Sequence, residues 1–285
     1  MLHLALTLLL PLGASPSPAT PAPLAPVAAV TPPVTWVDDE EVEELDEDTV
    51  EAAVEALEAA FEKGVEVPER ISAIQDAAAV PHEDVVRALK PGLKDDSQEV
   101  LLATMRVLGK METVEDSLDE LVTFYKKDRR LKKDEDLKAE TLWCIAWRGS
   151  PETLDLLSDD LFTNTNRRVL TARIYGMGRC RTPEAVESLM DIMKSAGKKK
   201  VQPFMADLRL SLAVLTGADN GNDQNRWIQW WGDNKRDLHV PEKQPEIHKG
   251  LQRKWDNFWG TQRDARGDDE GRGRGERGGD DDPDA

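Results

Sequence analysis

Residues 82–111 read HEDVVRALKPGLKDDSQEVLLATMRVLGKM, and this stretch decides the fold. On a helix of about 3.6 residues per turn, the segment VLLATMRVL is apolar on more than one face. Such a helix must be buried by neighbours on both sides. Because the helices between such segments carry a single apolar stripe, we predict stacked helix pairs that share a core which no single pair can build.

Helical spacing of apolar residues extends from residue 49 to residue 216. Val50, Val54, Leu57 and Phe61 lie on one face of a helix, and similar stripes follow within residues 114–125 and 186–193. No comparable run alternates between apolar and polar residues, so the sequence gives no support for strands. Breaks cut the region into helices of about 10–16 residues, with glycine after an end and proline near the next start; they fall at Gly64, Pro68, Pro81, Gly109, Gly149, Pro151, Gly178, Pro183 and Gly197.

An internal repeat supports the stack. Four inner helices end in similar phrases, VLG at 107–109, AWRG at 146–149, GMG at 176–178 and VLTG at 214–217, and their final glycines are 40, 29 and 39 residues apart. We expect Ala103 and Gly109 on the face shared between pairs. On these phrases the chain resembles HEAT-repeat proteins. The resemblance implies an all-α fold, a right-handed α-solenoid of about four to five degenerate HEAT-like helical hairpins over residues 49–217, with another helical bundle as the alternative.

The N-terminal end predicts export. Residues 4–12, LALTLLLPL, form a short apolar run followed by small residues, so we expect a signal peptide over residues 1–14 and a location in the periplasm, the cell envelope or outside the cell. A disordered apolar start is the alternative. The run is too short to span a bilayer. No cysteine lies near the expected cleavage site, so a lipid anchor is not indicated. We therefore expect no transmembrane segment after cleavage.

Both ends of the chain are acidic and are predicted to be disordered. Residues 15–48 are a Pro/Ala-rich linker and an acidic run, whose last eleven residues carry nine acids and no base. Residues 261–285 form a Gly/Arg/Asp tail with nine acids and five bases, too polar to offset its ordering entropy. An acidic partner-binding tail is the functional alternative for the N-terminal run. The net charge of −18 disfavours nucleic acid and anionic lipid as partners, unless a local basic patch overrides it.

Two basic clusters interrupt this acidic chain. Residues 126–136, KKDRRLKKDED, lengthen one connection between helices, and residues 198–200 are three lysines in an equivalent connection. These clusters are the candidate interaction surface, although a solvated loop that neutralises nearby acids is the simpler interpretation. If both connections lie at one edge, they form a cationic rim, which consists of Lys126, Lys127, Arg129, Arg130, Lys132, Lys133, Lys198, Lys199 and Lys200.

Residues 218–260 are predicted to form a Trp-rich C-terminal helical cap. Trp227, Trp230 and Trp231 share one helix face and would cover the open end of the stack, while an aromatic platform for a glycan or peptide is the alternative. This arrangement is similar to the ends of exported bacterial HEAT-repeat proteins. A last helix over about residues 244–259 is expected to pack back on the cap through Trp255, Phe258 and Trp259. The acids of the turn at 219–223 lack the spacing of an EF-hand loop.

Residues suited to chemistry are few. The four histidines, including His82, have no cysteine or serine neighbour in a nucleophile motif, and no phosphate loop or HExxH motif is present. Cys144 and Cys180 could form a disulfide, but an offset of about one helical turn favours buried free thiols. We therefore assign no catalytic, cofactor-binding or metal residue.

From these observations we expect a non-catalytic protein–protein interaction scaffold, acting as a monomer on a protein partner and needing no cofactor. Because some HEAT-like proteins are bilin lyases, an enzyme of that type is the alternative. A deep pocket that joined His82 or Cys180 to a carboxylate would favour it. Nucleic-acid or anionic-surface binding through the Lys-rich loops is the second alternative, and it conflicts with the global charge.

Overall fold

The computed structural model describes residues 45–159, 161, 166–195 and 198–261, without the side chains of Lys198 and Lys200. Within these residues every regular element is a helix and none is a strand, which confirms the all-α prediction. The predicted signal peptide, nearly all of the linker with its acidic run, and the tail beyond Thr261 lie outside the described residues.

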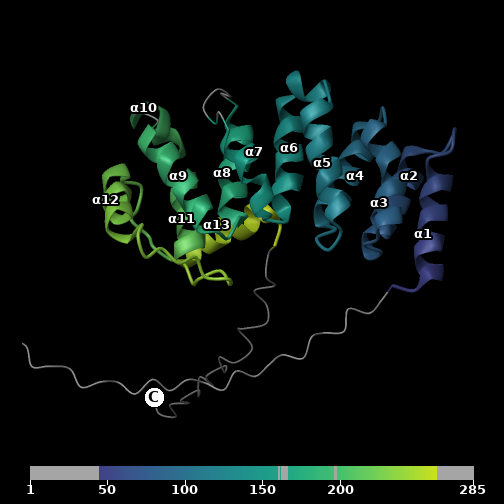
Figure 1. The fold of residues 1–285 in the computed structure, drawn as a ribbon. Helices are drawn as coiled ribbons and strands as arrows, with labels where there is room; N and C mark the ends of the chain where they lie inside the picture. Colours follow the sequence, from purple (N-terminus) through teal and green to yellow (C-terminus); the bar gives the residue numbers. More distant parts are fainter. Residues whose placement is uncertain (1–44, 160, 162–165, 196–197, 262–285) are drawn as a thin grey trace, which may run out of the picture. The chain divides into compact units, whose positions relative to one another are not determined.

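Eleven helices form two rows (Figure 1), in which each inner helix packs against the next inner helix and most outer helices pack against the next outer one. Short 3-10 turns and the four-residue helix α10 (Lys198–Val201) occupy several connections. The inner row contains α2 (Val67–Asp76), α4 (Gln98–Lys110), α6 (Glu135–Trp147), α8 (Arg167–Arg179) and α11 (Met205–Thr216). The outer row contains α1 (Glu47–Ala60), α3 (Glu83–Leu89), α5 (Glu115–Lys127), α7 (Leu154–Ser158), α9 (Pro183–Ser195) and α12 (Gln224–Asn234).

Several helices begin at a polar side chain that accepts a hydrogen bond from a backbone amide of the first turn. The carboxylate of Asp134 accepts from Leu137 N at the start of α6, at 2.8 Å. Asn166 accepts from two amides at the start of α8, and Asp223 accepts from Asn225 N at the start of α12. These caps satisfy amides that have no partner inside the helix, and so they fix where each helix starts.

The core consists of two apolar clusters that meet at α6. One cluster gathers buried residues between Val50 and Ile145, and the other gathers buried residues between Ala139 and Trp259. Helix α6 contributes to both: Leu137, Cys144 and Ile145 belong to the first cluster, and Ala139, Leu142 and Ala146 belong to the second. A helix that is apolar on more than one face can join two cores in this way.

The recurrent glycines of the inner helices permit close packing on α6. Gly109 and Gly176 both lie near helix ends, as expected: Gly109 is the next-to-last residue of α4, and Gly176 lies three residues before the end of α8. A β-carbon at Gly109 would lie 2.8 Å from the carbonyl oxygen of Cys144, and one at Gly176 would lie 2.7 Å from the β-carbon of Ala146. Both distances are shorter than real side chains tolerate, so the missing side chain is what lets these backbones approach α6.

Ala103 packs against the first core cluster, but it is less buried than its expected place on the shared face implies. Ala103 is half-buried and lines a groove between α2 and α4 on the side of the inner row that faces away from the outer row. We call this side the inner face. The periodicity placed Ala103 on an apolar helix, but it could not show that no further helix covers this part of α4.

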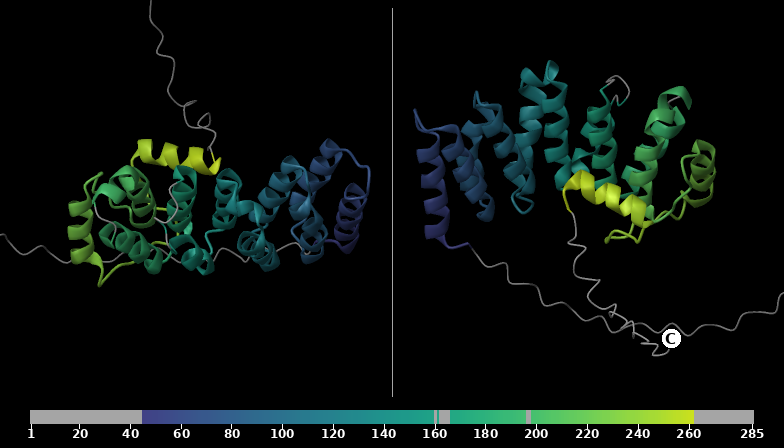
Figure 2. Two further views of the ribbon diagram at one scale, coloured as in Figure 1. Left: turned by 90° about the horizontal axis from the view of Figure 1, so that it is seen from above. Right: turned by 180° about the vertical axis from the view of Figure 1, so that it is seen from behind.

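The last helix, α13 (Lys249–Trp259), does not pack on the predicted cap (Figure 2). It starts five residues later than the expected helix, and it lies on the inner face, where Trp259 stacks at 5.8 Å on Trp143 of α6. Phe258 meets Tyr175 of α8 at 4.5 Å, ring centre to ring centre. Contacts with aromatic residues of α6 and α8 therefore place α13 on the inner face and not on α12.

We predict that Gly109→Ala lowers the free energy of unfolding by at least about 1 kcal/mol. The added methyl group forces α4 away from α6, and the resulting loss of stability exceeds the gain from the higher helix propensity of alanine. Gly232→Ala is the matched control, since Gly232 lies inside α12 with no neighbouring atom within 4 Å of the new carbon. Urea denaturation followed by circular dichroism measures both. Equal stability of the two variants would contradict the packing role of Gly109.

Candidate functional site

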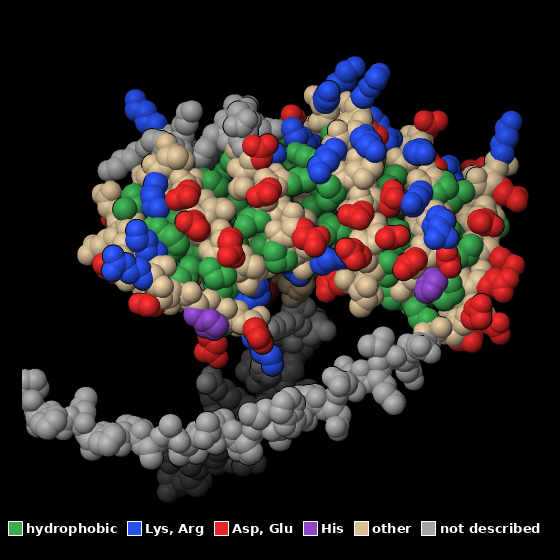
Figure 3. Space-filling view, viewed as in Figure 1, with side chains coloured by type: hydrophobic (Ala, Val, Ile, Leu, Met, Phe, Trp, Pro, Cys, Tyr) green, Lys and Arg blue, Asp and Glu red, His purple; other side chains and the backbone are tan. Residues whose placement is uncertain are grey.

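The two basic clusters lie at the same edge of the molecule. The connection between α5 and α6 and the connection between α9 and α11 both lead from an outer helix to an inner one, and both lie along the upper edge in Figure 1. Lys and Arg side chains protrude along this edge in Figure 3. We call the exposed cations of these two connections the basic edge; they are Lys126, Lys127, Arg129, Lys132, Lys133 and Lys199.

The cations of the basic edge are available to a partner. All six are exposed, and none of them has an acidic partner among the described residues. Lys126 and Lys127 belong to the last turn of α5, where the helix dipole favours positive charge. Lys198 and Lys200 lie in α10, and their side chains are outside the described part.

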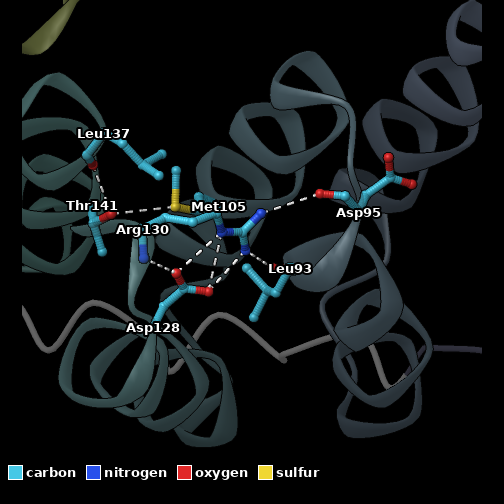
Figure 4. Close-up of polar contacts among 7 residues, drawn as sticks. All are labelled: Leu93, Asp95, Met105, Asp128, Arg130, Leu137 and Thr141. Atoms are coloured by element: carbon cyan, nitrogen blue, oxygen red, sulfur yellow. Dashed lines mark hydrogen bonds and ion pairs between the residues drawn. The ribbon is translucent and has the colours of Figure 1, made fainter. Parts of the chain in front are cut away.

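Arg130 differs from its neighbours because it holds two connections together (Figure 4). Its guanidinium pairs with Asp128, with Nη2 at 2.8 Å from Oδ2. The same group donates to the carbonyl oxygens of Leu93 at 2.7 Å and Asp95 at 3.2 Å, in the connection between α3 and α4. Sequence reasoning placed Arg130 on the interaction surface, whereas the structure uses its side chain within the fold.

The pair also shifts the ionisation of Asp128. The hydrogen bond from the Arg130 side chain holds the pKa of the Asp128 carboxyl below its ordinary value, against the effect of partial burial. A carboxyl whose pKa is lowered in the folded state stabilises the fold at neutral pH. That contribution is lost as the pH falls through the lowered pKa.

The three tryptophans of α12 serve mainly as core. Trp227 and Trp231 are buried against the end of the stack at α9, and Trp227 Nε1 donates to the carbonyl oxygen of Gly221 at 2.9 Å. Trp230 is half-buried with its ring edge-on to Trp227. With two of the three rings buried, this helix offers little of the aromatic platform that was the alternative.

An aromatic cluster on the inner face was missed by sequence reasoning. Trp143 and Trp147 of α6 contact Trp259, and Arg179 lies over the rings of both Trp147 and Trp259, at 5.2 and 4.9 Å from their centres. Trp143 Nε1 donates to the carbonyl oxygen of Phe258 at 3.1 Å. The signal was present, because Trp143 and Trp147 are four residues apart on one helix face.

A buried carboxylate joins α8 and α11 beside this cluster. Asp207 accepts hydrogen bonds from Arg167 Nη2 at 2.7 Å, Thr171 Oγ1 at 3.2 Å and Tyr175 Oη at 3.1 Å. Burial and the Asp207 charge raise the pKa of Tyr175 above its ordinary value. Three donors to one carboxylate satisfy its charge, so the network fixes the register of the two helices.

The residues with catalytic potential are kept apart. His82 accepts from Asp84 N at 3.2 Å and caps α3, while Cys180 lies just beyond the end of α8 and contacts Thr153. Cys144 and Cys180 are both free and buried, and burial raises the pKa of the Cys180 thiol to about 11. A thiol with a raised pKa is a poor nucleophile near neutral pH.

The acidic turn before α12 is also occupied by its own contacts. Asp219 binds Arg209 through two hydrogen bonds of 2.6 Å, and Asp223 caps α12. Across the described ranges, no group of three or more His, Cys, Asp or Glu side chains is arranged to hold a metal ion.

Comparisons with known proteins add no relative. No model of a protein family matches this chain, and no curated protein is similar to it in sequence.

We predict that Arg130→Ala lowers the free energy of unfolding by about 1–2 kcal/mol at pH 7, because two loop carbonyls and Asp128 lose their donor; the value is reduced for partial exposure. Arg129→Ala, a change at an exposed neighbour, should stay within about 0.5 kcal/mol of wild type. The effect of Arg130→Ala should shrink below about pH 4, as Asp128 takes up a proton.

Urea denaturation of the three proteins across this pH range measures these effects. Equal losses for Arg129→Ala and Arg130→Ala at pH 7, or a loss at Arg130 that grows on acidification, would contradict the structural role of Arg130.

Proposed function

We propose that this chain is a non-catalytic protein–protein interaction scaffold. We interpret the two rows of helices as a right-handed α-solenoid of about four to five HEAT-like hairpins. Support comes from the packing, since each inner helix lies against the next inner helix, and most outer helices lie against the next outer one. Such a stack exposes long surfaces in proportion to its number of repeats.

The observation that carries the proposal is the basic edge. Its six exposed cations stand on a chain with a net charge of −18, and none of them has an acidic partner in the part of the chain described. Exposed like charges on one edge attract an oppositely charged surface and speed its association. An acidic surface of a protein partner therefore fits this edge.

The proposed location rests on the predicted signal peptide. The signal peptide expected at residues 1–14 supports export to the periplasm, the cell envelope or the medium. No helix in the described residues is long and apolar enough to cross a membrane. We propose that the scaffold acts as a monomer on a partner in one of these places.

The same edge also favours the second candidate function, binding to nucleic acid or an anionic surface. Lysines attract phosphate without any sequence readout, and such binding weakens steeply with salt. The bilin-lyase alternative gains less support, because His82 and Cys180 each serve the fold locally.

The test is an affinity capture from the native envelope fraction with the full chain as bait. The variant Lys132→Glu/Lys133→Glu reverses the charge of two of the six cations of the basic edge, and Lys235→Glu/Arg236→Glu makes the same charge change at exposed residues just after α12. We predict that the edge variant reduces recovery of the partner by about ten-fold or more, and that the control recovers it normally. Raising the salt concentration should weaken capture by the wild-type chain.

Recovery of the same proteins in equal yield by both variants would contradict the role of the basic edge. A parallel titration with poly(U) RNA and with phosphatidylglycerol vesicles separates the second candidate. Tight binding to either one at near-physiological salt, lost in the edge variant, would replace the protein partner by an anionic polymer or membrane.

A further inference from the structure

We propose that the groove between α2 and α4 on the inner face binds an acidic amphipathic helix of a partner protein. This inference rests on the proposed scaffold function and names the chemistry of its partner. It concerns a different surface from the basic edge.

The inner face already accepts one amphipathic helix, because α13 lies on it. Leu251, Trp255 and Trp259 of α13 are buried there, against α6 and α8. Figure 2 shows α13 over this part of the inner row, while α2 and α4 carry no described helix on the same side. One half of the inner face is therefore covered by a packed helix, and the other half has an open groove.

The open groove continues from the seat of α13. A cavity of about 510 Å³ opens beside the end of α13, and its walls include Trp143 and Phe258 from the α13 interface together with Arg106 of α4. Arg106 also lines the next cavity, of about 580 Å³, between α2 and α4. The two cavities therefore meet at Arg106, and the second extends an interface that the protein already uses.

The dimensions of the groove match a helix of three turns. Its lining residues on α4 run from Glu99 to Lys110, a span of about 16 Å at 1.5 Å per residue. Opposite α4 the lining residues are Ile71 and Gln75 of α2 and Ala78 of the 3-10 turn that follows α2. Helix α13 has 11 residues and the same approximate length.

The lining selects an apolar stripe flanked by acids. Ile71, Leu102 and Ala103 are half-buried and form an apolar floor. Along α4 the floor is bordered by Arg106, whose side chain is 54% exposed, and by exposed Lys110. The Arg106 guanidinium donates through Nε to Glu140 at 2.8 Å, which leaves its terminal nitrogens to bind a second carboxylate.

Charge also favours an acidic helix over a basic one. Among the residues that line the groove, Glu99 is the one acid, against Arg106 and Lys110. Arg168, 61% exposed, lines the neighbouring cavity and pairs with Asp136 at 2.7 Å. An aliphatic stripe with Asp or Glu on either side therefore satisfies both the floor and its border, as helix-in-groove recognition requires.

Two designed three-turn peptides test the inference, each cross-linked into a helix and labelled with fluorescein. They share one leucine stripe and differ in their flanking residues, glutamate in one and lysine in the other. Fluorescence anisotropy with the full chain at near-physiological salt should show the acidic peptide binding about ten-fold tighter or more.

Arg106→Glu should weaken the acidic peptide by about ten-fold or more, and Ala103→Glu should do the same by placing a carboxylate on the floor. Arg87→Glu is the matched control, because Arg87 lies on α3 of the outer row with a side chain 66% exposed. Thermal melting checks that each variant is folded. If one groove variant unfolds, the other decides.

Equal affinity for both peptides, or equal effects of Arg106→Glu and Arg87→Glu, would overturn the inference. The variant Lys132→Glu/Lys133→Glu separates it from the scaffold proposal and should bind the acidic peptide like wild type. If that variant alone loses the peptide, the basic edge is the site, so the groove inference fails while the scaffold proposal stands. If the groove binds the peptide but no protein is captured through the edge, the scaffold proposal fails in its present form.

Discussion

The structure depends on the close approach of three inner helices, α4, α6 and α8. Helix α6 contributes buried residues to both apolar clusters, so it needs a closely packed neighbour on each flank. Gly109 on one side and Gly176 on the other make that approach possible. The two apolar clusters are therefore joined through one helix. The outer helices then take their positions by packing against the inner helices.

This constraint also explains where the surfaces are. The inner row is covered by the outer row on one side, but its opposite side would leave the rings of Trp143 and Trp147 in water. Helix α13 covers them at the C-terminal half of the row and leaves the α2–α4 groove open. At this edge Arg130 joins the α5–α6 connection to the α3–α4 connection by hydrogen bonds. The neighbouring lysines therefore project from a backbone that is held in place.

Much of this fold could be predicted from the sequence, because helical periodicity and the repeated phrases are local signals. They predicted an all-helical chain, a helix buried on more than one face at residues 100–108, and a helix after residue 218 that covers the end of the stack with Trp227, Trp230 and Trp231. They could not show that Gly109 and Gly176 pack against α6, since a glycine at a close contact reads like a glycine that ends a helix. The use of Arg130, the seat of α13 and the open groove at Ala103 depend on residues far apart in the chain, and no spacing encodes them.

The most direct test of the account is native-state hydrogen exchange of the full chain, read by mass spectrometry. If α6 joins both cores, its amides and those of the facing halves of α4 and α8 should exchange together in the slowest class, at the rate of global unfolding. Helices α1 and α12, each at one end of the outer row, should exchange faster. The account would be contradicted if the amides of α6 exchanged as fast as those of α12. It would also be contradicted if residues 50–130 and residues 150–259 unfolded separately at different rates.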